Sequence, residues 1–320
     1  GGVKTVLGVS VKYAKQRKAF GKSIAEFGLI QHKLAEMGIR GYVSEAMVYR
    51  TGGLIDAHLA DFSWSRPDAP QAVLKAVEEF AVECSIVKVY CSEVLDYCVD
   101  EGVQIHGGYG YHQDYPIERA YRDSRINRIF EGTNEINRLL TTGMLLKRAV
   151  KGQLALIPAA QALLGEALAG PSLGEDGDEG PLAAEHRITA NAKKVALLAA
   201  GVAFQRFLTE LENQQEVLGG ISDIIMEAYA MDSAVLRTEK LLAAGRGALA
   251  TDMTAVFVRE ALARIENSAR TVLAACAEGD NLRVNLAFLR RLTRFEPVNA
   301  IALRQRIAAR LIEAERYLVS

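Results

Sequence analysis

Apolar residues recur at helical spacing along most of the chain. One such face runs through Ile30, Leu34, Met37, Gly41, Ser44 and Val48, and a second through Val73, Val77, Phe80, Cys84, Val87, Cys91, Val94 and Cys98. A later face comprises Ile221, Ile225, Ala228, Met231 and Val235. No alternating stretch of four or more residues predicts a strand. With seven prolines in 320 residues, the pattern predicts an all-α fold.

Breaks in this pattern divide the chain. Prolines in Ser63–Pro70 separate the first two helices, and the glycines of residues 101–116 predict a loop after the second. Thr133 predicts the N-cap of a helix that continues to about Lys151. Residues 170–181 hold four glycines, two prolines and four acids, a composition that cannot bury a face. We therefore expect helical domains at 1–152 and 182–320, joined by a linker at 153–181.

Composition excludes several classes of protein. Half of the residues are hydrophobic and the net charge is −1, which argues against a nucleic-acid-binding surface. No apolar run approaches the roughly 18 residues of a membrane-spanning helix. Cys84, Cys91 and Cys98 lie seven residues apart, about 10.5 Å along a helix, so they predict a buried stripe and no metal site. The chain begins Gly1-Gly2 without Met, so we expect a cut or processed start.

Two polar patterns allow more than one interpretation. The turn Gly107-Gly108-Tyr109-Gly110 follows a predicted helix, so it indicates close backbone approach and no nucleotide-binding fingerprint of the Rossmann or Walker type. An arginine recurs every third residue at Arg119, Arg122, Arg125 and Arg128. This stripe fits either an anion site or ion pairs with Glu118, Asp123 and neighbouring helices, and we favour the ion pairs.

The segment after this stripe is the most informative. Glu135 lies in the first helical turn after Thr133, where an acid complements the helix dipole. Glu131 precedes the cap, between Phe130 and Gly132. If Phe130 excludes water, burial raises the pKa of Glu131 and makes it a base for a weakly acidic C–H bond. From the pattern alone we favour the other interpretation, an ordinary surface acid.

Three ordered motifs resemble the C-terminal helical domain of the acyl-CoA dehydrogenases over about residues 1–150. They are Tyr13–Lys22 (YAKQRKAFGK), Gln104–Tyr111 (QIHGGYGY) and, after Arg122-Asp123, Ile129–Ile136 (IFEGTNEI). Phe27–Gln31 and the additional segment 182–320 look more like the very-long-chain branch. The resemblance implies formation of the trans-2 double bond of long-chain acyl-CoA in fatty acid β-oxidation, with FAD as cofactor.

The resemblance also implies residue roles. Glu131 matches the base that removes the α-proton while a hydride passes from Cβ to FAD, and Phe130 and Gly132 lie against the substrate. The base's own backbone N–H and a ribityl hydroxyl of FAD form the oxyanion hole. The matches to the FAD contacts, some of them across a subunit interface, are Arg17, Ala19, Phe20, Gln104, Ile105, His106, Gly107, Gly108, Thr133 and Glu135. These contacts imply at least a homodimer, and the family passes electrons to electron-transfer flavoprotein.

Some features depart from the family. Many members have His-Gln or Phe-Gln at Phe27-Gly28, which puts one FAD contact in doubt. The N-terminal helical and middle β-domains are missing, so we expect this fragment alone to bind FAD poorly and to be inactive. Residues 182–320 match extensions that replace a tetramer contact or assist peripheral membrane association. We expect a cytoplasmic location in a bacterium and a mitochondrial one in a eukaryote.

Two other functions fit the same motifs. One is an assembly protein with a vestigial site, against which the intact Glu131 and flavin-contact motifs argue. The other is a flavin oxidase or monooxygenase of the same superfamily, whose members commonly lack this glutamate.

Overall fold

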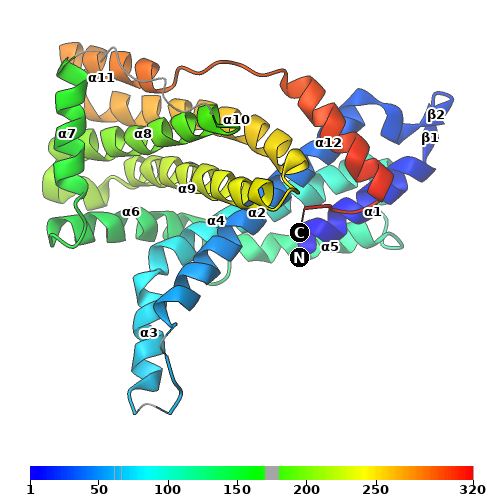
Figure 1. The fold of residues 1–320 in the computed structure, drawn as a ribbon, viewed down its shortest axis with the longest axis horizontal. Helices are drawn as coiled ribbons and strands as arrows, with labels where there is room; N and C mark the ends of the chain where they lie inside the picture. The colour runs from blue at the N-terminus through cyan, green and yellow to red at the C-terminus, as the bar shows by residue number, and fades with distance from the viewer. Residues whose placement is uncertain (61, 66, 170–179, 320) are drawn as a thin grey trace.

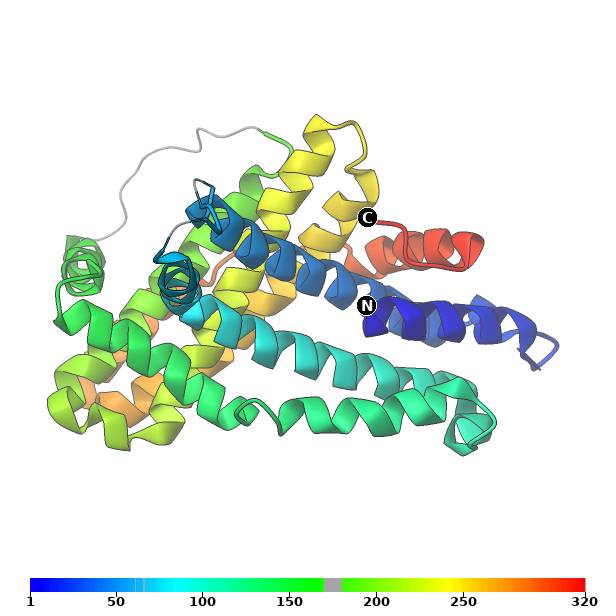
Figure 2. The same cartoon turned by 90° about the horizontal axis from the view of Figure 1, so that it is seen from below.

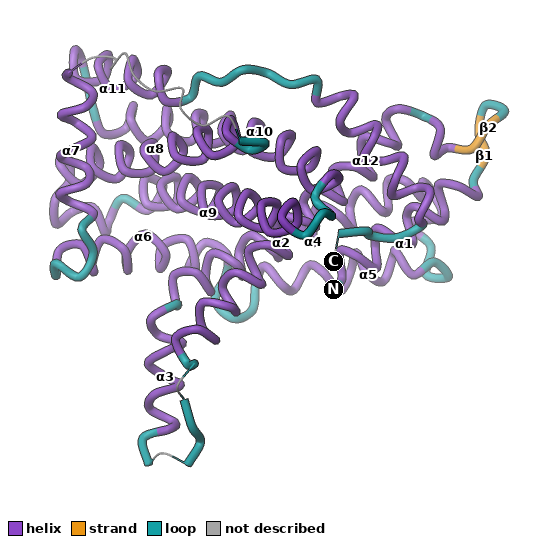
Figure 3. The backbone as a smooth tube through the Cα atoms, viewed as in Figure 1, coloured by secondary structure: helices purple, strands orange, loops and turns teal. Residues whose placement is uncertain are grey.

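The computed structural model describes residues 1–60, 62–65, 67–169 and 180–319, and helices form nearly all of it (Figure 3). The first half contains α1 (Gly2–Gln16), α2 (Gly28–His58), α3 (Ala69–Glu79), α4 (Ala81–His106), α5 (Pro116–Ser124) and α6 (Asn134–Val150). The second contains α7 (Leu156–Ala169), α8 (Ala183–Phe207), α9 (Gln215–Ala243), α10 (Ala248–Cys276), α11 (Gly279–Leu292) and α12 (Ala300–Ala314). The all-α prediction is confirmed.

The strands of the described residues form one short hairpin. β1 (Lys18–Ala19) pairs antiparallel with β2 (Lys22–Ser23). Phe20 (φ 50°) and Gly21 (φ 83°) form its two-residue turn, as the right-handed twist of a tight hairpin requires. Two residues per strand are too few for an alternating pattern, which is why the sequence predicted no strand here.

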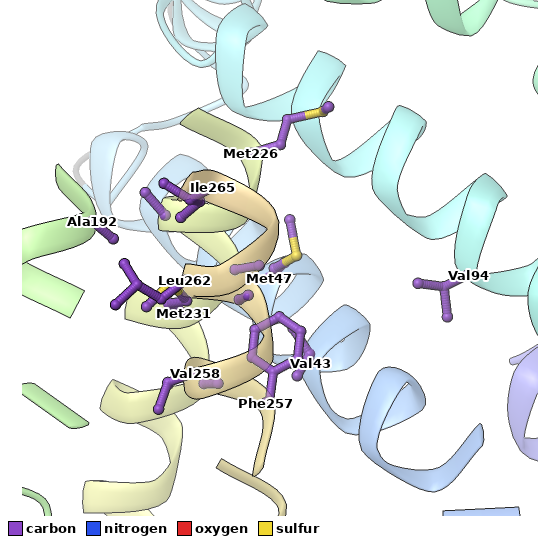
Figure 4. Packing of buried hydrophobic residues seen from close by; sticks show 14 of the residues in the cluster. Val43, Met47, Val94, Ala192, Met226, Met231, Phe257, Val258, Leu262 and Ile265 are labelled. Carbon is purple, nitrogen blue, oxygen red and sulfur yellow. The ribbon is translucent and has the colours of Figure 1, made fainter. Parts of the chain in front are cut away.

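One buried core runs through both halves of the chain, from Val6 to Val319. α9 packs against α8 and α10 and also against α2 and α6, while α12 crosses back onto α2 (Figures 1 and 2). At the centre, Val43 and Met47 of α2 lie close to Met231 of α9 and Phe257 of α10 (Figure 4). Residues 182–319 are therefore packed along the helices that precede them.

Two predicted boundaries are wrong. The face predicted as one helix from Val73 to Cys98 belongs to two helices, because the backbone turns at Phe80 (φ −98°, ψ 20°) between α3 and α4. α3 then projects from the body (Figure 1), which leaves Val77 exposed. The loop predicted from residue 101 begins later, since α4 continues until Gly107 adopts a positive φ of 60°.

The cysteine stripe lies on α4 as expected, with Cys98 buried and Cys84 and Cys91 half-buried. Burial raises the pKa of Cys91 to about 11 and that of Cys98 to about 12, so both thiols stay protonated at neutral pH. These cysteines pack as small apolar side chains.

Part of the predicted linker is helical. α7 forms within residues 153–181 because its apolar side chains pack on α8, where Gly201 leaves room for Ala160. Residues 170–179, which carried the linker prediction most strongly, lie outside the described residues. Across the described ranges, no helix combines the length and the apolar character needed to cross a membrane.

Candidate active site

The site residues predicted from sequence fall into two groups at different levels of α4. The first group is a turn and helix start that contains Phe130, Glu131, Gly132, Thr133 and Glu135. Lys88 of α4 donates to the Gly132 carbonyl, and Ser92 of α4 bonds to Asn134 within the same helix start. Arg17 lies at the end of α1, and its guanidinium approaches the ring of Tyr109, next to Gln104–Gly108 at the other end of α4. Ala19 and Phe20 lie in the hairpin that follows α1, which projects away from this end of α4 (Figures 1 and 2). Between Ser92 and Gln104 the helix rises about 18 Å. The fold brings together the members of the first group and places Arg17 near Gln104–Gly108, but it leaves Ala19 and Phe20 apart in the hairpin and keeps the two groups separate.

The turn that carries Glu131 has an unusual backbone. Glu131 has a φ of 57° and Gly132 a φ of 79°. The left-handed conformation is ordinary for glycine but costs about 1–2 kcal/mol for a residue with a side chain. Such a conformation persists only where surrounding groups impose it.

Side-chain donors impose this conformation by holding the carbonyls of the turn. Asn137 Nδ2 donates to the carbonyl oxygens of Gly132 (2.8 Å), Thr133 (3.1 Å) and Glu131 (3.4 Å). Lys88 Nζ, from α4, donates to the same Gly132 oxygen at 2.7 Å. Asn137 is buried, so its amide has no competing water and the turn is firmly fixed.

The start of α6 is fixed in the same way. Thr133 caps the helix by accepting the Ile136 N–H (3.3 Å), as predicted. Asn134 is buried; its Oδ1 accepts Lys88 Nζ (2.8 Å), and its Nδ2 donates to Ser92 Oγ (3.0 Å). Hydrogen bonds from its own backbone N–H and from the Thr133 hydroxyl lower the pKa of Glu135, so an anion is stabilised at this helix start.

Glu131 itself is exposed in this chain, as the surface-acid interpretation favoured from the pattern alone expects, and the burial that the alternative required is absent here. Phe130 cannot exclude water, because 45% of its own surface is exposed. The neighbouring large apolar side chains that are also exposed are Ile126, Ile129, Ile136 and Leu140. The carboxylate therefore stands beside apolar residues that no other described residue covers.

In the second group, two residues are buried and the others form an open surface. Ile105 and His106 are buried, so they support the turn from below. The His106 ring stacks on Tyr13 (4.0 Å between centroids), and its Nδ1 donates to the carbonyl of Gly102 at 2.7 Å. Burial lowers the pKa of His106, which keeps the ring neutral.

The surface that Ile105 and His106 support is open to solvent. Gln104, Gly107 and Gly108 are exposed, and a Cβ added at either glycine would meet nothing within 4 Å. The Arg17 guanidinium lies 5.8 Å from the Tyr109 ring, and Phe20 is 96% exposed. Ala19 is half-buried in the hairpin. The group offers a cation, an amide and accessible backbone to a bound molecule.

The arginine stripe consists mainly of ion pairs, as we favoured. Arg122 pairs with Glu118, Arg119 with Asp123 at 3.5 Å, and Arg128 with Asp96 of α4 at 3.0 Å. Arg125 is exposed. The stripe therefore supports the local fold of residues 116–128.

Family models match both halves of the chain. One described as the acyl-CoA dehydrogenase C-terminal domain matches residues 1–145, and a second with the same description matches residues 191–291. The chain belongs to the acyl-CoA dehydrogenase family. The two matched ranges lie within the predicted segments 1–152 and 182–320.

One relative is similar to this chain over its whole length, and another over most of it. A probable acyl-CoA dehydrogenase of Bacillus subtilis strain 168 is 47% identical over 322 residues, which is 100% of this chain and 54% of that protein. The very long-chain specific acyl-CoA dehydrogenase of rat mitochondria is 30% identical over 270 residues, 77% of this chain and 37% of that protein. This chain spans about half the length, or less, of these relatives.

A solved structure shows the same arrangement of helices. It is an acyl-CoA dehydrogenase complexed with FAD from Bacillus anthracis, 46% identical, with a TM-score of 0.95. The match covers 99% of this chain and 54% of that one.

Sequence reasoning missed the residues that hold the turn. Lys88 carries no motif signal, and its contact with Gly132 joins residues 44 positions apart. Asn134 and Asn137 stand within or next to the quoted motif, and their small amide side chains beside a glycine were the available signal.

Proposed function

We propose that this chain acts as the C-terminal helical part of an FAD-dependent acyl-CoA dehydrogenase of fatty acid β-oxidation, with Glu131 as the base that removes the α-proton of a long-chain acyl-CoA. The observation that carries the proposal is the left-handed Glu131 turn held by Asn137 and Lys88. Strained backbone clusters at functional sites, so the conformation of Glu131, held by donors from two helices, supports a role for its side chain.

The chemistry places three demands on such a base. The α-proton of a thioester is weakly acidic, so the base must be positioned, shielded from water and assisted by donors to the carbonyl oxygen. The hydrogen-bonded turn supplies the position, and the Glu131 backbone N–H is the donor that this chain contributes. The exposed apolar residues Ile126, Phe130 and Ile136 supply shielding once substrate and the remainder of the enzyme cover them. Gly132 gives the thioester room to approach the turn.

The residues also suit FAD, which when bound accepts the hydride from the substrate Cβ. Arg17 supplies a cation and the α6 N-terminus at Thr133 supplies a dipole, each suited to a phosphate group. Glu135 supplies an acceptor at the same helix start, suited to the adenine amino group. Exposed Gln104, Gly107 and Gly108 allow close approach of a polar ligand, and Phe20 provides an uncovered aromatic ring, with Ala19 beside it. Ile105 and His106 support this surface from below.

The separation of the two groups fits contacts to the FAD of two different protomers, so a homodimer is part of the proposal. The N-terminal portion (1–152) carries both groups, and residues 182–320 support them. We propose electron-transfer flavoprotein as electron acceptor, and the bacterial cytoplasm or the mitochondrion as location. Peripheral membrane association of residues 182–320 also remains a proposal.

The test is Glu131→Gln in the complete enzyme with FAD bound. We expect anaerobic reduction of the flavin by a long-chain acyl-CoA to slow at least about a hundredfold, because a general base contributes that much or more. Stopped-flow absorbance of the flavin band measures the rate. Glu278→Gln is the matched control, since Glu278 is also exposed and precedes a glycine of positive φ (57°) at a helix start. A Glu131→Gln rate equal to that of the control would contradict the proposal.

A further inference from the structure

The Glu131 turn is connected to the second half of the chain through Arg138. Arg138 lies on α6, one helical turn after Asn134. Its Nη1 and Nη2 donate to the two carboxylate oxygens of Glu93 on α4, at 2.8 and 3.0 Å. Its Nε donates to Asp223 Oδ1 on α9 at 2.7 Å. One guanidinium thus joins α4, α6 and α9.

The hydrogen bonds continue from Glu93 to the turn itself. Glu93 Oε1 also accepts Asn134 Nδ2 at 3.1 Å. Asn134 Oδ1 accepts Lys88 Nζ at 2.8 Å, and the same Lys88 nitrogen holds the Gly132 carbonyl at 2.7 Å. Every link from the α9 helix to the turn is therefore a direct hydrogen bond.

Asp223 determines how the guanidinium is held. Burial opposes the charge of Arg138, but the hydrogen bonds that it donates to Glu93 and Asp223 more than compensate and raise its pKa. A planar fork held on both Nε and its two terminal nitrogens cannot rotate. Without Asp223 the guanidinium is held by Glu93 alone. It can then rotate, and the Glu93 carboxylate can move with it and lose the hydrogen bond from Asn134.

From this chain of contacts we infer that Asp223 is a positioning residue, through which the second helical half holds the Glu131 turn in its working geometry. The inference rests on the proposed role of Glu131 as base. It assigns residues 182–320 a part in the reaction, in addition to their packing in the shared core.

A second ion pair of α9 provides a control. Asp232 accepts Arg50 of α2 at 2.8 Å and Lys193 of α8 at 2.6 Å. Like Asp223, Asp232 is a carboxylate of α9 that forms ion pairs with cations of other helices. Neither Arg50 nor Lys193 hydrogen-bonds to the described residues of the Glu131 turn. Asp232 therefore reports what the loss of a comparable structural pair does by itself.

The Asp223 site tolerates substitution. Arg138, Glu93 and Asp223 line a polar cavity of about 310 Å³, and 43% of the Asp223 side chain is exposed. Water can therefore replace the lost carboxylate oxygen, and Asp223→Asn is expected to fold.

The experiment compares Asp223→Asn, Asp223→Glu and Asp232→Asn in the complete enzyme with FAD bound. We expect Asp223→Asn to slow flavin reduction by a saturating long-chain acyl-CoA about tenfold, with the dissociation constant for that acyl-CoA within about twofold of wild type. Asp223→Glu should recover most of the rate, and Asp232→Asn should keep the wild-type rate.

Equal rates for Asp223→Asn and Asp232→Asn would overturn the inference, as would a loss of acyl-CoA affinity that accounts for the whole effect. Glu131→Gln, measured beside them, separates the two proposals. A slow Glu131→Gln with an unaffected Asp223→Asn refutes only the positioning role. A normal Glu131→Gln refutes the proposed function, and the positioning role with it.

Discussion

The two glycine turns that α4 supports are built in different ways. The Glu131–Gly132 turn is fixed from within the chain, by Asn137 and Lys88 bound to its carbonyls. The Gly107–Gly108 turn rests on the buried ring of His106, and its outer surface is open. The first turn is held by contacts within the chain, whereas the second leaves its backbone accessible. The difference teaches that the backbone carrying the proposed base is fixed by this chain alone, while the second turn has room for a ligand to approach, as the proposed function requires.

The largest expected effect comes from filling the space beneath the second turn. A Cβ at Gly110 would lie 2.5 Å from the Val103 carbonyl oxygen, a backbone atom that cannot move aside. Gly110→Ala should destabilise the chain by about 3 kcal/mol, measured by urea unfolding. Gly108→Ala, whose Cβ would meet nothing within 4 Å, is the control. If both substitutions cost the same, the support beneath this turn is not rigid.

A smaller loss should follow from disturbing the first turn. Asn137→Asp replaces the NH₂ group that faces three carbonyls with an acceptor, and should cost about 2 kcal/mol by the same measurement. Asn127→Asp is the matched control, because Asn127 Nδ2 donates to one carbonyl, that of Ser124 at 3.0 Å. Equal losses in the two variants would show that the triple contact does not hold the turn.

The smallest effect concerns pH. The pKa of His106 is lowered from an unfolded value of 6.5, so the unfolded chain binds a proton more readily than the folded one. The stability that neutral His106 contributes is therefore present above pH 6.5 and is lost as the pH falls through the lower folded pKa. His106→Phe keeps the ring against Tyr13 but cannot titrate.

Urea unfolding of the chain at pH 7.5 and pH 5 measures this contribution. His106→Phe should remove about 1 kcal/mol of the stability that wild type loses between these values. An unchanged pH dependence in the variant would refute the contribution of His106.

Features of the fold that depend on neighbouring residues in the chain could be predicted from the sequence. Thr133 caps α6 as predicted, because a threonine cap needs only the N–H groups of the next turn. The apolar face of α9 was also predictable, since Ile221 and Met231 are fully buried there. The break at Phe80 was not, because the apolar spacing continues through it while α3 leaves the body.

Contacts between residues distant in the sequence, and the surroundings of Glu131, are what the sequence pattern did not predict. The hydrogen bond between Arg138 and Asp223 joins residues 85 positions apart, and no local pattern indicates it. Glu131 is exposed, as the surface-acid interpretation expects, and the apolar side chains around it are exposed too. The motif thus identified a candidate base without showing how its environment is completed.

The most direct test of the account is α-proton exchange without the hydride step. An acyl-CoA with no hydrogen on Cβ, such as 3,3-dimethylbutyryl-CoA, can lose and regain only its α-protons. We expect the complete enzyme in D₂O to exchange these protons, as followed by NMR, and Glu131→Gln to exchange them at least about a hundredfold more slowly. Exchange by Glu131→Gln at the wild-type rate would show that another group removes the proton.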